Sequence, residues 1–448
     1  MEDQPQEIHP WSNQDQISHA RALLVGVHRT GAGEPQAQDH LKELNLLAQT
    51  LKVPVAASWC TLVRDLSATT FLSSGKVTQL RNEIAASGAN LVIFDDEISP
   101  SQQRNLEESL KIPVMDRTEV ILGVFASRAK TREAKLQIEM AQIKYASPRL
   151  KRLWLHLSRQ TGGGGGASGG GYLRGKGEKQ IEMDRRALKR RLEHLQSELK
   201  GVCRYRQTQR QRRERTAIPV FAIVGYTNAG KSTLMNRMTG AHVLVEDKLF
   251  ATLDTTTRQC LLPNNQPVLL TDTVGFIRKL PHLLVAAFRS TLEESVEADV
   301  LLHLIDSSHP LALEQAKTTM EVLAELNAKD RPIITVINKI DLAEHDARAR
   351  ATIQKLRISY PKSVQVSAAT GEGVSQLFDE MAAALADRRR RLFLRIPQSE
   401  YRLVAEALRE GTVFSQDYDG NDVLIDVELP IAHAQQLEAY VTAAGEKS

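Results

Sequence analysis

A glycine-rich run that ends in a lysine and a serine is the first feature of this sequence with chemistry in it. The run GYTNAGKS spans residues 225–232, directly after the apolar segment VFAIVG and before a segment with a helical pattern. Glycines in such a setting let several backbone amides converge on a phosphate group. Lys231 would then reach the β and γ phosphates, and the Ser232 hydroxyl would ligate Mg²⁺. The predicted phosphate-loop contacts are Gly225, Tyr226, Thr227, Asn228, Ala229, Gly230, Lys231 and Ser232.

A second motif, DTVG at residues 272–275, ends the apolar segment PVLLTDT. Asp272 is suited to hold the magnesium ion through water, and the Gly275 amide is suited to meet the γ-phosphate. We therefore predict that Lys231 and Gly275 act in catalysis. The nucleotide contacts predicted from this motif are Asp272, Thr273, Val274 and Gly275.

Between these two motifs lies LFATLDTTTR, a threonine-rich segment without strong periodicity. Such a segment is typical of a switch whose threonine joins Mg²⁺ only when the γ-phosphate is present. We predict that Thr252 is this residue, with a catalytic role, and Thr255, Thr256 and Thr257 remain alternatives. The predicted metal ligands are therefore Ser232, Thr252 and Asp272. The nucleotide contacts predicted in this segment are Phe250, Ala251, Thr252, Leu253 and Asp254.

A third motif, NKID at residues 338–341, follows the apolar segment PIITVIN and indicates which base is bound. The Asp341 carboxylate can accept hydrogen bonds from the ring N–H and the exocyclic amine of guanine, whereas adenine has no such amine. Ser367 and Ala368, after the next apolar segment, would complete the pocket through a backbone contact. The predicted base contacts are Asn338, Lys339, Asp341, Ser367 and Ala368. The motifs occur in the order that GTP binding with Mg²⁺ requires, so GTP and Mg²⁺ are the predicted cofactors.

The residue after DTVG is Phe276, at a place where Ras-like enzymes hold a glutamine that orients the attacking water. A phenyl ring can neither donate nor accept that hydrogen bond, so we expect slow intrinsic hydrolysis. Either another group or a bound partner must order the water. The alternative is that Phe276 simply packs and that a nearby threonine or backbone carbonyl suffices.

These motifs require a sheet that brings the ends of distant strands together. Five apolar segments, beginning near residues 220, 267, 300, 332 and 363, alternate with helical patterns. This order predicts a doubly wound, mainly parallel P-loop GTPase domain over residues 218–387, with its motifs at the carboxyl ends of the strands.

Two smaller α/β or α+β regions flank this part of the chain. Residues 20–128 alternate the apolar segments ARALLVGV, VPVAASW and LVIFDDE with helical patterns, which predicts a small parallel α/β domain. One of its helices should begin at SPSQQRNLEESL, with Ser99 as N-cap and proline in the first turn. Residues 390–448 predict a small α+β domain in the order strand, helix, strand, strand, helix, and residues 1–19 a flexible N-terminus.

Residues 129–215 predict a helical hairpin. Leu136, Met140, Ile143, Leu150, Leu153 and Leu157 on one arm, and Leu188, Leu192, Leu195, Leu199 and Val202 on the other, form apolar seams. The tip would be the run TGGGGGASGGGYLRGKGEKQ, in which ten of the residues 162–177 are glycine. A disordered linker is the commoner meaning of such a run, but its place between two helical arms favours a tip loop. Because the seam can be satisfied within one chain, we expect a monomer.

Charge is concentrated on the second arm of this hairpin. Twelve basic and three acidic side chains give residues 185–215 a net charge of +9, which leaves −5 for the rest of a chain whose total is +4. A basic block on an otherwise acidic protein attracts a nucleic-acid phosphate backbone without sequence preference. A solvated helix face is the alternative.

Composition excludes several other classes. With 42% hydrophobic and 25% charged residues in 448, the chain is neither wholly disordered nor collagen-like, and about three domains are expected. No apolar stretch approaches the roughly 18 residues that span a membrane, and the start of the chain is not a signal peptide. Cys60, Cys203 and Cys260 have no pair spacing, which fits a reducing compartment. We expect a cytoplasmic protein.

Taken together, the basic arm, the glycine-rich run and the motifs GYTNAGKSTLMN, FATLD, DTVGFIRKLPHLLVAAFRSTLEE and NKID resemble the HflX family of translational GTPases. The resemblance covers most of the chain, including DRTEVILGVFASRAKTREAKLQIEMAQIKYASPRL from Asp116. It implies binding to the large ribosomal subunit and its rRNA, GTPase stimulation by ribosomes, and splitting or rescue of stalled ribosomes under stress. The alternative is a GTPase of ribosome assembly or tRNA modification.

The tip loop departs from the pattern of the family it resembles. The family loop is similar to GGGIGxRGPGETQLETDRR, whereas this chain has GGGGGASGGGYLRGKGEKQIEMDRR. Lys176 stands where proline is usual, and Lys179 replaces threonine. The resemblance implies that this loop lies near the peptidyl transferase centre, so the departure raises the hypothesis of a specialised or antibiotic-related paralogue.

Overall fold

The computed structural model describes residues 20–150, 182–202, 218–240, 249–250, 255–279, 298–328, 331–344 and 346–442. These residues fall into two compact units. The first unit is built within residues 1–205, 247–253 and 279–288, and the second within residues 206–246, 254–278 and 289–448. Each unit is described by itself.

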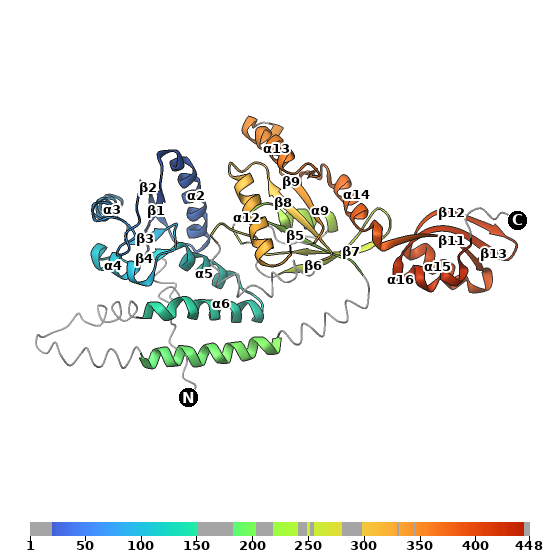
Figure 1. The fold of residues 1–448 in the computed structure, drawn as a ribbon, viewed down its shortest axis with the longest axis horizontal. Helices are drawn as coiled ribbons and strands as arrows, with labels where there is room; N and C mark the ends of the chain where they lie inside the picture. Colours follow the sequence, from blue (N-terminus) through green and yellow to red (C-terminus); the bar gives the residue numbers. More distant parts are fainter. Residues whose placement is uncertain are drawn as a thin grey trace, which may run out of the picture. The chain divides into compact units, whose positions relative to one another are not determined.

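A four-stranded parallel sheet with the order β2-β1-β3-β4 forms the centre of the first unit (Figure 1). Its strands are β1 (Ala22–His28), β2 (Val55–Leu62), β3 (Leu91–Phe94) and β4 (Val114–Asp116). The predicted parallel α/β domain is thus confirmed. The short strand β4 was not predicted, because three residues carry too little periodicity to be distinguished from a loop.

Helices cover both faces of this sheet. They are α2 (Glu34–Thr50), α3 (Ser74–Ser87), α4 (Pro100–Leu110) and α5 (Arg117–Arg128), with a 3₁₀ turn η1 (Gly31–Gly33). Residues from α3 and α4, such as Leu80 and Leu106, share one apolar core with β1 and β3. The predicted start of α4 is confirmed, because the Ser99 side chain accepts a hydrogen bond from the Gln102 amide at 3.2 Å and the reciprocal bond of a capping box is also present.

The two arms of the predicted hairpin pack against each other within the described residues. Helix α6 (Arg132–Ala146) and its 3₁₀ extension η2 (Ser147–Arg149) lie against the helix over residues 182–202. Arg132, at the start of α6, pairs with Glu198 near the end of the second helix at 3.0 Å. Glu139, further along α6, pairs with Arg191, which lies earlier in the second helix, at 2.7 Å. The two arms are therefore antiparallel. The seam contains Leu136, Met140, Ile143, Leu150, Leu188, Leu192, Leu195 and Val202, as predicted. Leu199, which was predicted as well, is only partly buried and is not part of this cluster. The glycine-rich run, Leu153 and Leu157 lie outside the described residues.

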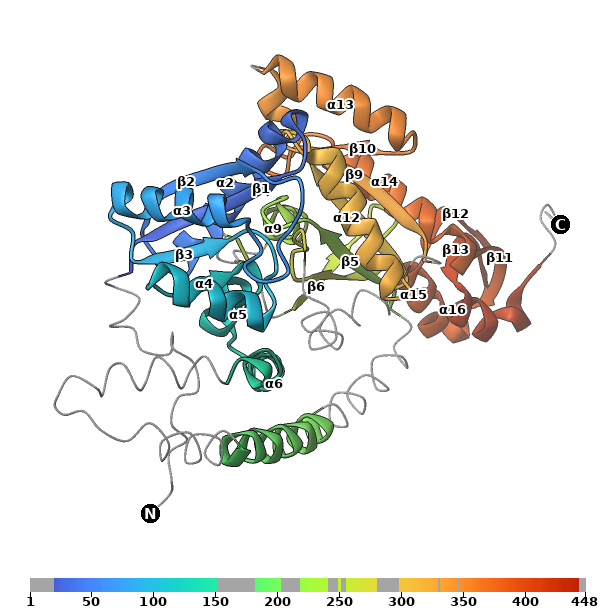
Figure 2. The same cartoon turned by 60° about the vertical axis from the view of Figure 1, so that its left-hand side comes forward.

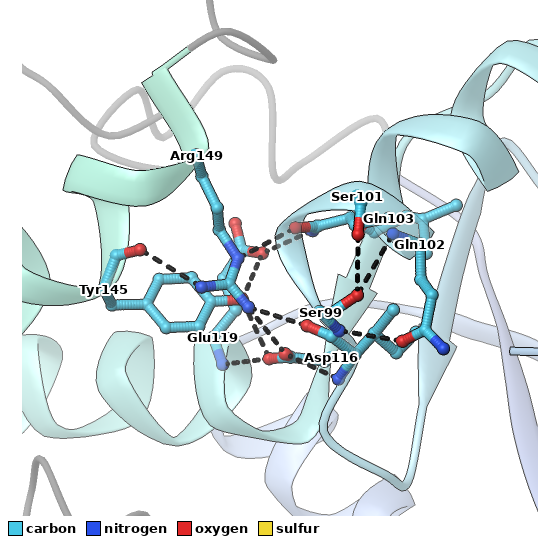
Figure 3. A network of polar contacts seen from close by, with 10 residues as sticks. Ser99, Ser101, Gln102, Gln103, Asp116, Glu119, Tyr145 and Arg149 are labelled. Carbon is cyan, nitrogen blue, oxygen red and sulfur yellow. Dashed lines mark hydrogen bonds and ion pairs between the residues drawn. The ribbon is translucent and has the colours of Figure 1, made fainter. Parts of the chain in front are cut away.

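A buried polar network joins the end of α6 to the N-terminal sheet (Figure 3). The Asp116 carboxylate accepts hydrogen bonds from the Glu119 amide and the Tyr145 hydroxyl, both at 2.9 Å, and pairs with Arg149 at 3.4 Å. The Arg149 guanidinium also donates to Gln103 Oε1 at 3.0 Å and to the Ile98 carbonyl at 2.8 Å. Each of these buried charges therefore has several partners inside the first unit.

The second unit contains a six-stranded sheet with the order β10-β9-β8-β5-β7-β6 (Figures 1 and 2). Its strands are β5 (Val220–Gly225), β6 (Thr256–Leu261), β7 (Pro267–Asp272), β8 (Val300–Asp306), β9 (Ile333–Asn338) and β10 (Val364–Gln365). All five predicted strands are present and parallel to one another. The sixth, β6, is an antiparallel edge strand that was not predicted, and it contains Thr256 and Thr257, two of the alternatives offered for the switch threonine. Most of its side chains are at least partly exposed, which removes the apolar alternation that would have identified it.

Helices lie on both faces of this sheet as well (Figure 2). They are α9 (Lys231–Thr239), α12 (Ala312–Glu325), α13 (Ala347–Ser359) and α14 (Val374–Ala384), with 3₁₀ turns η3 (Ile340–Glu344) and η4 (Ala386–Arg388). Leu234 and Met235 of α9 pack with Leu377 and Met381 of α14 in one core. Residues of α12 and α13, including Leu356, form a second cluster with Ile305 and Ile337. The doubly wound fold is confirmed.

The C-terminal part of the second unit has the predicted α+β order. Strands β11 (Arg389–Pro397), β12 (Thr412–Asp419) and β13 (Asp422–Pro430) form an antiparallel sheet ordered β11-β13-β12. Helices α15 (Tyr401–Glu410) and α16 (Ile431–Gln436) share a core with it, and η5 (Gln398–Glu400) and η6 (Glu438–Tyr440) are 3₁₀ turns. Across the described parts of both units, no helix is long and apolar enough to cross a membrane.

Candidate functional site

The glycine-rich run lies between strand β5 and helix α9, as its sequence context predicted. Gly225 and Gly230 have φ angles of +156° and +94°. A Cβ atom on Gly225 would lie 2.3 Å from the Leu304 carbonyl oxygen, and one on Gly230 would lie 2.4 Å from Asn338 Nδ2. Both positions therefore require glycine, for the backbone angle and for the close approach of neighbouring strands. The loop ends at the N-terminus of α9, where backbone amides attract anions.

Lys231 begins helix α9 and has its ammonium group buried in the loop. Its Nζ atom donates to the Tyr226 carbonyl at 2.8 Å and to the Gly225 carbonyl at 3.2 Å. Burial lowers the pKa of Lys231 to about 8, an effect that the Asp272 carboxylate opposes. A buried cation gains strongly from a further anion beside it. This arrangement suits a phosphate group.

Ser232 and Asp272, the two described candidates for metal ligands, are in contact. The Ser232 hydroxyl donates to Asp272 Oδ2 at 2.5 Å, and Asp272 is 1% exposed at the end of β7. A hydroxyl and a carboxylate oxygen match the ligand preference of Mg²⁺, so these residues fit the ion. The third candidate, Thr252, lies outside the described residues. Of its alternatives, Thr256 and Thr257 are in the β6 ladder, paired with Asp272 and Thr271, and Thr255 immediately precedes that strand.

The loop after β7 approaches the phosphate loop closely at Gly275. A Cβ atom there would lie 2.8 Å from Thr227 Cα and 2.9 Å from Lys231 Nζ. Thr273 is buried and donates to the Ile223 carbonyl at 2.7 Å, and Val274 is buried as well. The structure therefore brings Gly275 beside Lys231, as expected, while Thr273 and Val274 hold the loop in place.

Phe276 is a packing residue in this structure. Its side chain is 1% exposed, and its backbone pairs with the phosphate loop through Gly225 and Thr227 at 3.0 and 2.8 Å. The ring is therefore part of the core and is not directed at a nucleotide. The packing of Phe276, offered as the alternative, is what the structure shows, and slow intrinsic hydrolysis stays a prediction.

Asn338 links the phosphate loop to the loop after β10. Its side-chain amide donates to the Ala229 carbonyl at 2.8 Å and accepts from the Ala368 amide at 2.9 Å. These two bonds join three of the predicted motifs, although they are separated by up to about 140 residues. Ser367 is fully buried and adjoins this junction.

The Asp341 carboxylate of the NKID motif has one oxygen atom that no described residue hydrogen-bonds. Its Oδ1 atom is buried and has no hydrogen-bond partner among the residues that the structure describes. A buried carboxylate oxygen without a partner is destabilising unless a donor reaches it. The ring N–H and exocyclic amine of guanine are donors of the right kind.

Sequence reasoning missed one charged residue at this edge of the sheet. Asp306 ends strand β8 and pairs with Lys339 Nζ at 2.7 Å, which orients the lysine of the NKID motif. Its position at the carboxyl end of a parallel strand was the available signal. Lys339 itself has a φ angle of +64°.

Two residues next to the motifs belong to the first unit. The Phe250 ring lies at 4.4 Å, edge to face, from the Phe125 ring, and the Lys279 ammonium pairs with Asp96. Contact between Phe250 and a nucleotide thus stays a prediction. The other nucleotide contacts predicted here, Ala251, Thr252, Leu253 and Asp254, lie outside the described residues, and Asn228 is exposed at a φ angle of +61°.

The helix over residues 182–202 presents its basic side chains to solvent. Leu188 and Leu195 are buried in the seam, whereas the cationic residues Arg185, Arg186, Lys189, Arg190 and Lys200 are exposed. This distribution is what a helix requires to pack on one side and contact a polyanion on the other. The remaining basic residues of the block, from Arg204 to Arg215, lie outside the described residues.

Comparison with known proteins identifies relatives over most of the chain. Family models described as "GTP-binding GTPase N-terminal", "GTP-binding GTPase Middle Region" and "50S ribosome-binding GTPase" match residues 38–126, 128–213 and 220–339. The GTPase HflX of Akkermansia muciniphila is 47% identical over 94% of this chain and 97% of that protein. The GTPase HflX of Chlamydia pneumoniae is 45% identical over 92% and 86%, and that of Escherichia coli 42% identical over 82% and 84%.

Among solved structures, a crystal structure named as an SsGBP and GDP complex is similar to this chain. It is 26% identical, with a TM-score of 0.43, and the match covers 81% of this chain and 98% of that one.

Proposed function

The chain belongs to the HflX family of GTPases, and from that premise we propose that it binds GTP with Mg²⁺ and acts on the large ribosomal subunit. In this proposal it splits or rescues stalled ribosomes under stress. The observation that carries the ribosomal part is the helix over residues 182–202, whose exposed face is basic while its other face is held in the seam with α6.

In the proposed nucleotide site, each group has a separate task. The amides of residues 225–232 and the Lys231 ammonium hold the phosphates, and Ser232, Asp272 and Thr252 hold Mg²⁺, which when bound neutralises charge on the phosphate oxygens. The Gly275 amide contacts the γ-phosphate. Supporting this assignment, Lys231 and Gly275 already converge, and Ser232 contacts Asp272.

The base pocket in this proposal comprises Asn338, Lys339, Asp341, Ser367 and Ala368. Asn338 holds the phosphate loop and the loop after β10 at a fixed separation through its two hydrogen bonds. Asp341 then accepts hydrogen bonds from the ring N–H and exocyclic amine of guanine, and its Oδ1 atom has no other donor among the described residues.

Phosphate contacts by the basic helix would place the protein on RNA without reading its sequence. Such contacts are electrostatic, so binding must weaken as salt rises. The glycine-rich residues 162–177 follow α6 and precede this helix in the chain, so they are the second segment to test.

The first experiment is GTP turnover by the full-length protein, alone and with purified large ribosomal subunits, across a salt series. We expect ribosome-stimulated turnover that is lost when Arg185, Arg186, Lys189 and Arg190 are all changed to glutamate. The matched control changes Arg348, Arg350, Lys355 and Arg357, which are equally numerous and exposed on helix α13. Light scattering by intact ribosomes reports splitting in the same samples.

Two results would contradict this proposal. Equal loss in the basic-helix and α13 variants would mean that only net charge matters. No stimulation of the wild type by large subunits would reject the ribosomal role and favour a GTPase of ribosome assembly or tRNA modification. Shortening residues 162–177 tells whether that run contributes to stimulation, to splitting or to neither.

A further inference from the structure

GTP hydrolysis at the proposed nucleotide site needs a group that orders the attacking water. Phe276 occupies the place where a glutamine would act, and its ring is in the core at 1% exposure. Hydrolysis nevertheless requires a donor or acceptor that holds water in line with the γ-phosphorus.

Most hydroxyl groups near the loop are already engaged. The Tyr226 hydroxyl accepts from the Arg278 amide at 2.7 Å, and the Ser232 hydroxyl donates to Asp272 at 2.5 Å. The Thr273 hydroxyl donates to the Ile223 carbonyl at 2.7 Å. Each of these groups has a structural or metal-related partner that fixes its orientation.

Thr227 is the exception among the described residues of the loop. The residue is 6% exposed, and its Oγ1 atom is buried without a hydrogen-bond partner in the described parts of the chain. Valine would fill the same space without an unsatisfied hydroxyl, so packing alone does not account for threonine here. A buried polar atom of this kind calls for a ligand.

The position of Thr227 indicates which part of the nucleotide that ligand accompanies. Its Cα and Cγ2 atoms both lie 2.8 Å from the point that a Cβ atom on Gly275 would occupy, and Lys231 Nζ lies 2.9 Å from the same point. Its amide also donates to the Phe276 carbonyl at 2.8 Å. Thr227, Gly275 and Lys231 therefore meet at one place, which the proposed site gives to the γ-phosphate.

We propose that the Thr227 hydroxyl takes the place of the missing glutamine and orders the attacking water. A hydroxyl has one proton and two lone pairs, so it can accept a hydrogen bond from water while donating to a γ-phosphate oxygen. The water oxygen forms a bond to the γ-phosphorus, and the bond from that phosphorus to the β–γ bridging oxygen breaks. The electron pair leaves with GDP, and the water proton passes to a γ-phosphate oxygen. Thr227 gains and loses no proton.

This inference rests on the proposed nucleotide site but not on the ribosomal role. The test is single-turnover GTP hydrolysis by full-length Thr227→Val, with GTP and GDP affinities measured alongside. We expect the hydrolysis rate to fall roughly 100-fold, as for loss of one positioned catalytic hydrogen bond, while both affinities change less than about threefold. Thr227→Ser, which keeps the hydroxyl, should recover most of the rate.

A second readout separates positioning from a structural effect. Binding of GDP with aluminium fluoride, which mimics the transferring phosphoryl group, should weaken in Thr227→Val, whereas binding of a non-hydrolysable GTP analogue should not. Thr319→Val is the matched control. It removes another buried hydroxyl of the second unit, one that donates to the Gln315 carbonyl at 3.0 Å on helix α12. Its rate should equal that of the wild type.

The outcomes decide the matter in either direction. A wild-type rate in Thr227→Val would overturn the inference, as would equal losses of rate and GTP affinity, because the hydroxyl would then serve ground-state binding. A slow Thr227→Ser variant would overturn it too. Failure of the wild type to bind GTP at all would reject the nucleotide site itself, which is a distinguishable result.

Discussion

Two regions of this molecule bury several charged groups, and they differ in how completely those groups are paired. In the network of the first unit, Asp116 and Arg149 are surrounded by hydrogen-bond partners from α4, α5 and α6 (Figure 3). In the proposed nucleotide site, Asp341 Oδ1 and Thr227 Oγ1 are buried without partners among the described residues. The first region is complete as it stands, whereas the second has hydrogen-bonding capacity left over.

The difference separates a structural role from a binding role on physical grounds. A buried group whose partners are all internal contributes to holding elements together, and its loss should show in stability. A buried group without a partner costs stability until a ligand supplies one. Substitutions in the two regions should therefore affect different measurements.

The largest effect expected is on stability, from Arg149→Met in the first unit. This change leaves the Asp116 carboxylate buried without its cation, which costs about 3–5 kcal/mol for a broken buried pair. Chemical denaturation of the first unit measures the loss. Arg132→Met is the control, because the Arg132–Glu198 pair is exposed and solvent screening should leave it little effect on stability. Similar losses in both variants, or a change in GTP affinity, would contradict the comparison.

The next effect is on binding, from Asp341→Asn in the second unit. Two hydrogen bonds to a charged carboxylate, at about 1.5 kcal/mol or more each, are lost, so GDP affinity should fall at least about 100-fold. Affinity for a xanthosine nucleotide should rise, since its C2 carbonyl can accept from the asparagine amide. Equilibrium titration measures both, with the exposed Glu325→Gln on helix α12 as the control. An unchanged preference for guanine would remove Asp341 from the pocket.

A smaller effect is expected from Gly275→Ala. The added methyl group would lie 2.8–2.9 Å from Thr227 and Lys231 Nζ, so the loop must shift away from the place proposed for the γ-phosphate. Overpacking of this kind costs about 1–3 kcal/mol, and it should appear as weaker binding of GTP but not of GDP. Gly75→Ala, which meets no atom within 4 Å, is the control. Equal losses for both nucleotides would place the effect outside the γ-phosphate.

The smallest effect is a pH dependence with opposite signs in the two units. His303 in β8 is fully buried, and desolvation lowers its pKa to about 4, so the unfolded chain takes up its proton first as the pH falls. The second unit should thus lose about 1 kcal/mol of stability between pH 7 and 5.5. Burial raises the pKa of Asp116 to about 6, so its protonation should favour the folded first unit over the same interval.

Calorimetry of the wild type and His303→Leu across this interval measures the pH effect. The leucine variant should remove the acid sensitivity of the second unit and leave the opposite trend of the first unit unchanged. Identical pH profiles in the two proteins would show that His303 does not titrate as its burial requires.

Much of the fold could be predicted from the sequence because its strands are long, continuous apolar segments. Strands β5, β7 and β9 were predicted because each is continuous and buried, and the motifs were placed correctly at their ends. The start of α4 was readable from Ser99 and the proline after it. Strand β6 was missed, since an edge strand with exposed side chains has no alternation to detect.

The candidate site divides in the same way. Each of the phosphate loop and the NKID motif consists of consecutive residues, so its chemistry can be predicted from the sequence alone. The role of Asn338 in joining Ala229 to Ala368 could not be predicted from the sequence, because its hydrogen-bond partners lie 109 and 30 residues away. Asp306 was missed although it ends a predicted strand, because it belongs to no contiguous motif.

By itself, the sequence determined the order of the motifs, the guanine-type pocket they predict and the helical seam, because each depends on residues close together in the chain. The tertiary structure decided which polar groups are satisfied and which are not. Arg149 meets Ile98 across 51 residues, and Thr227 meets Gly275 across nearly as many. Whether a buried atom has a partner depends on every element packed around it, and that is a property of the fold and not of any local pattern.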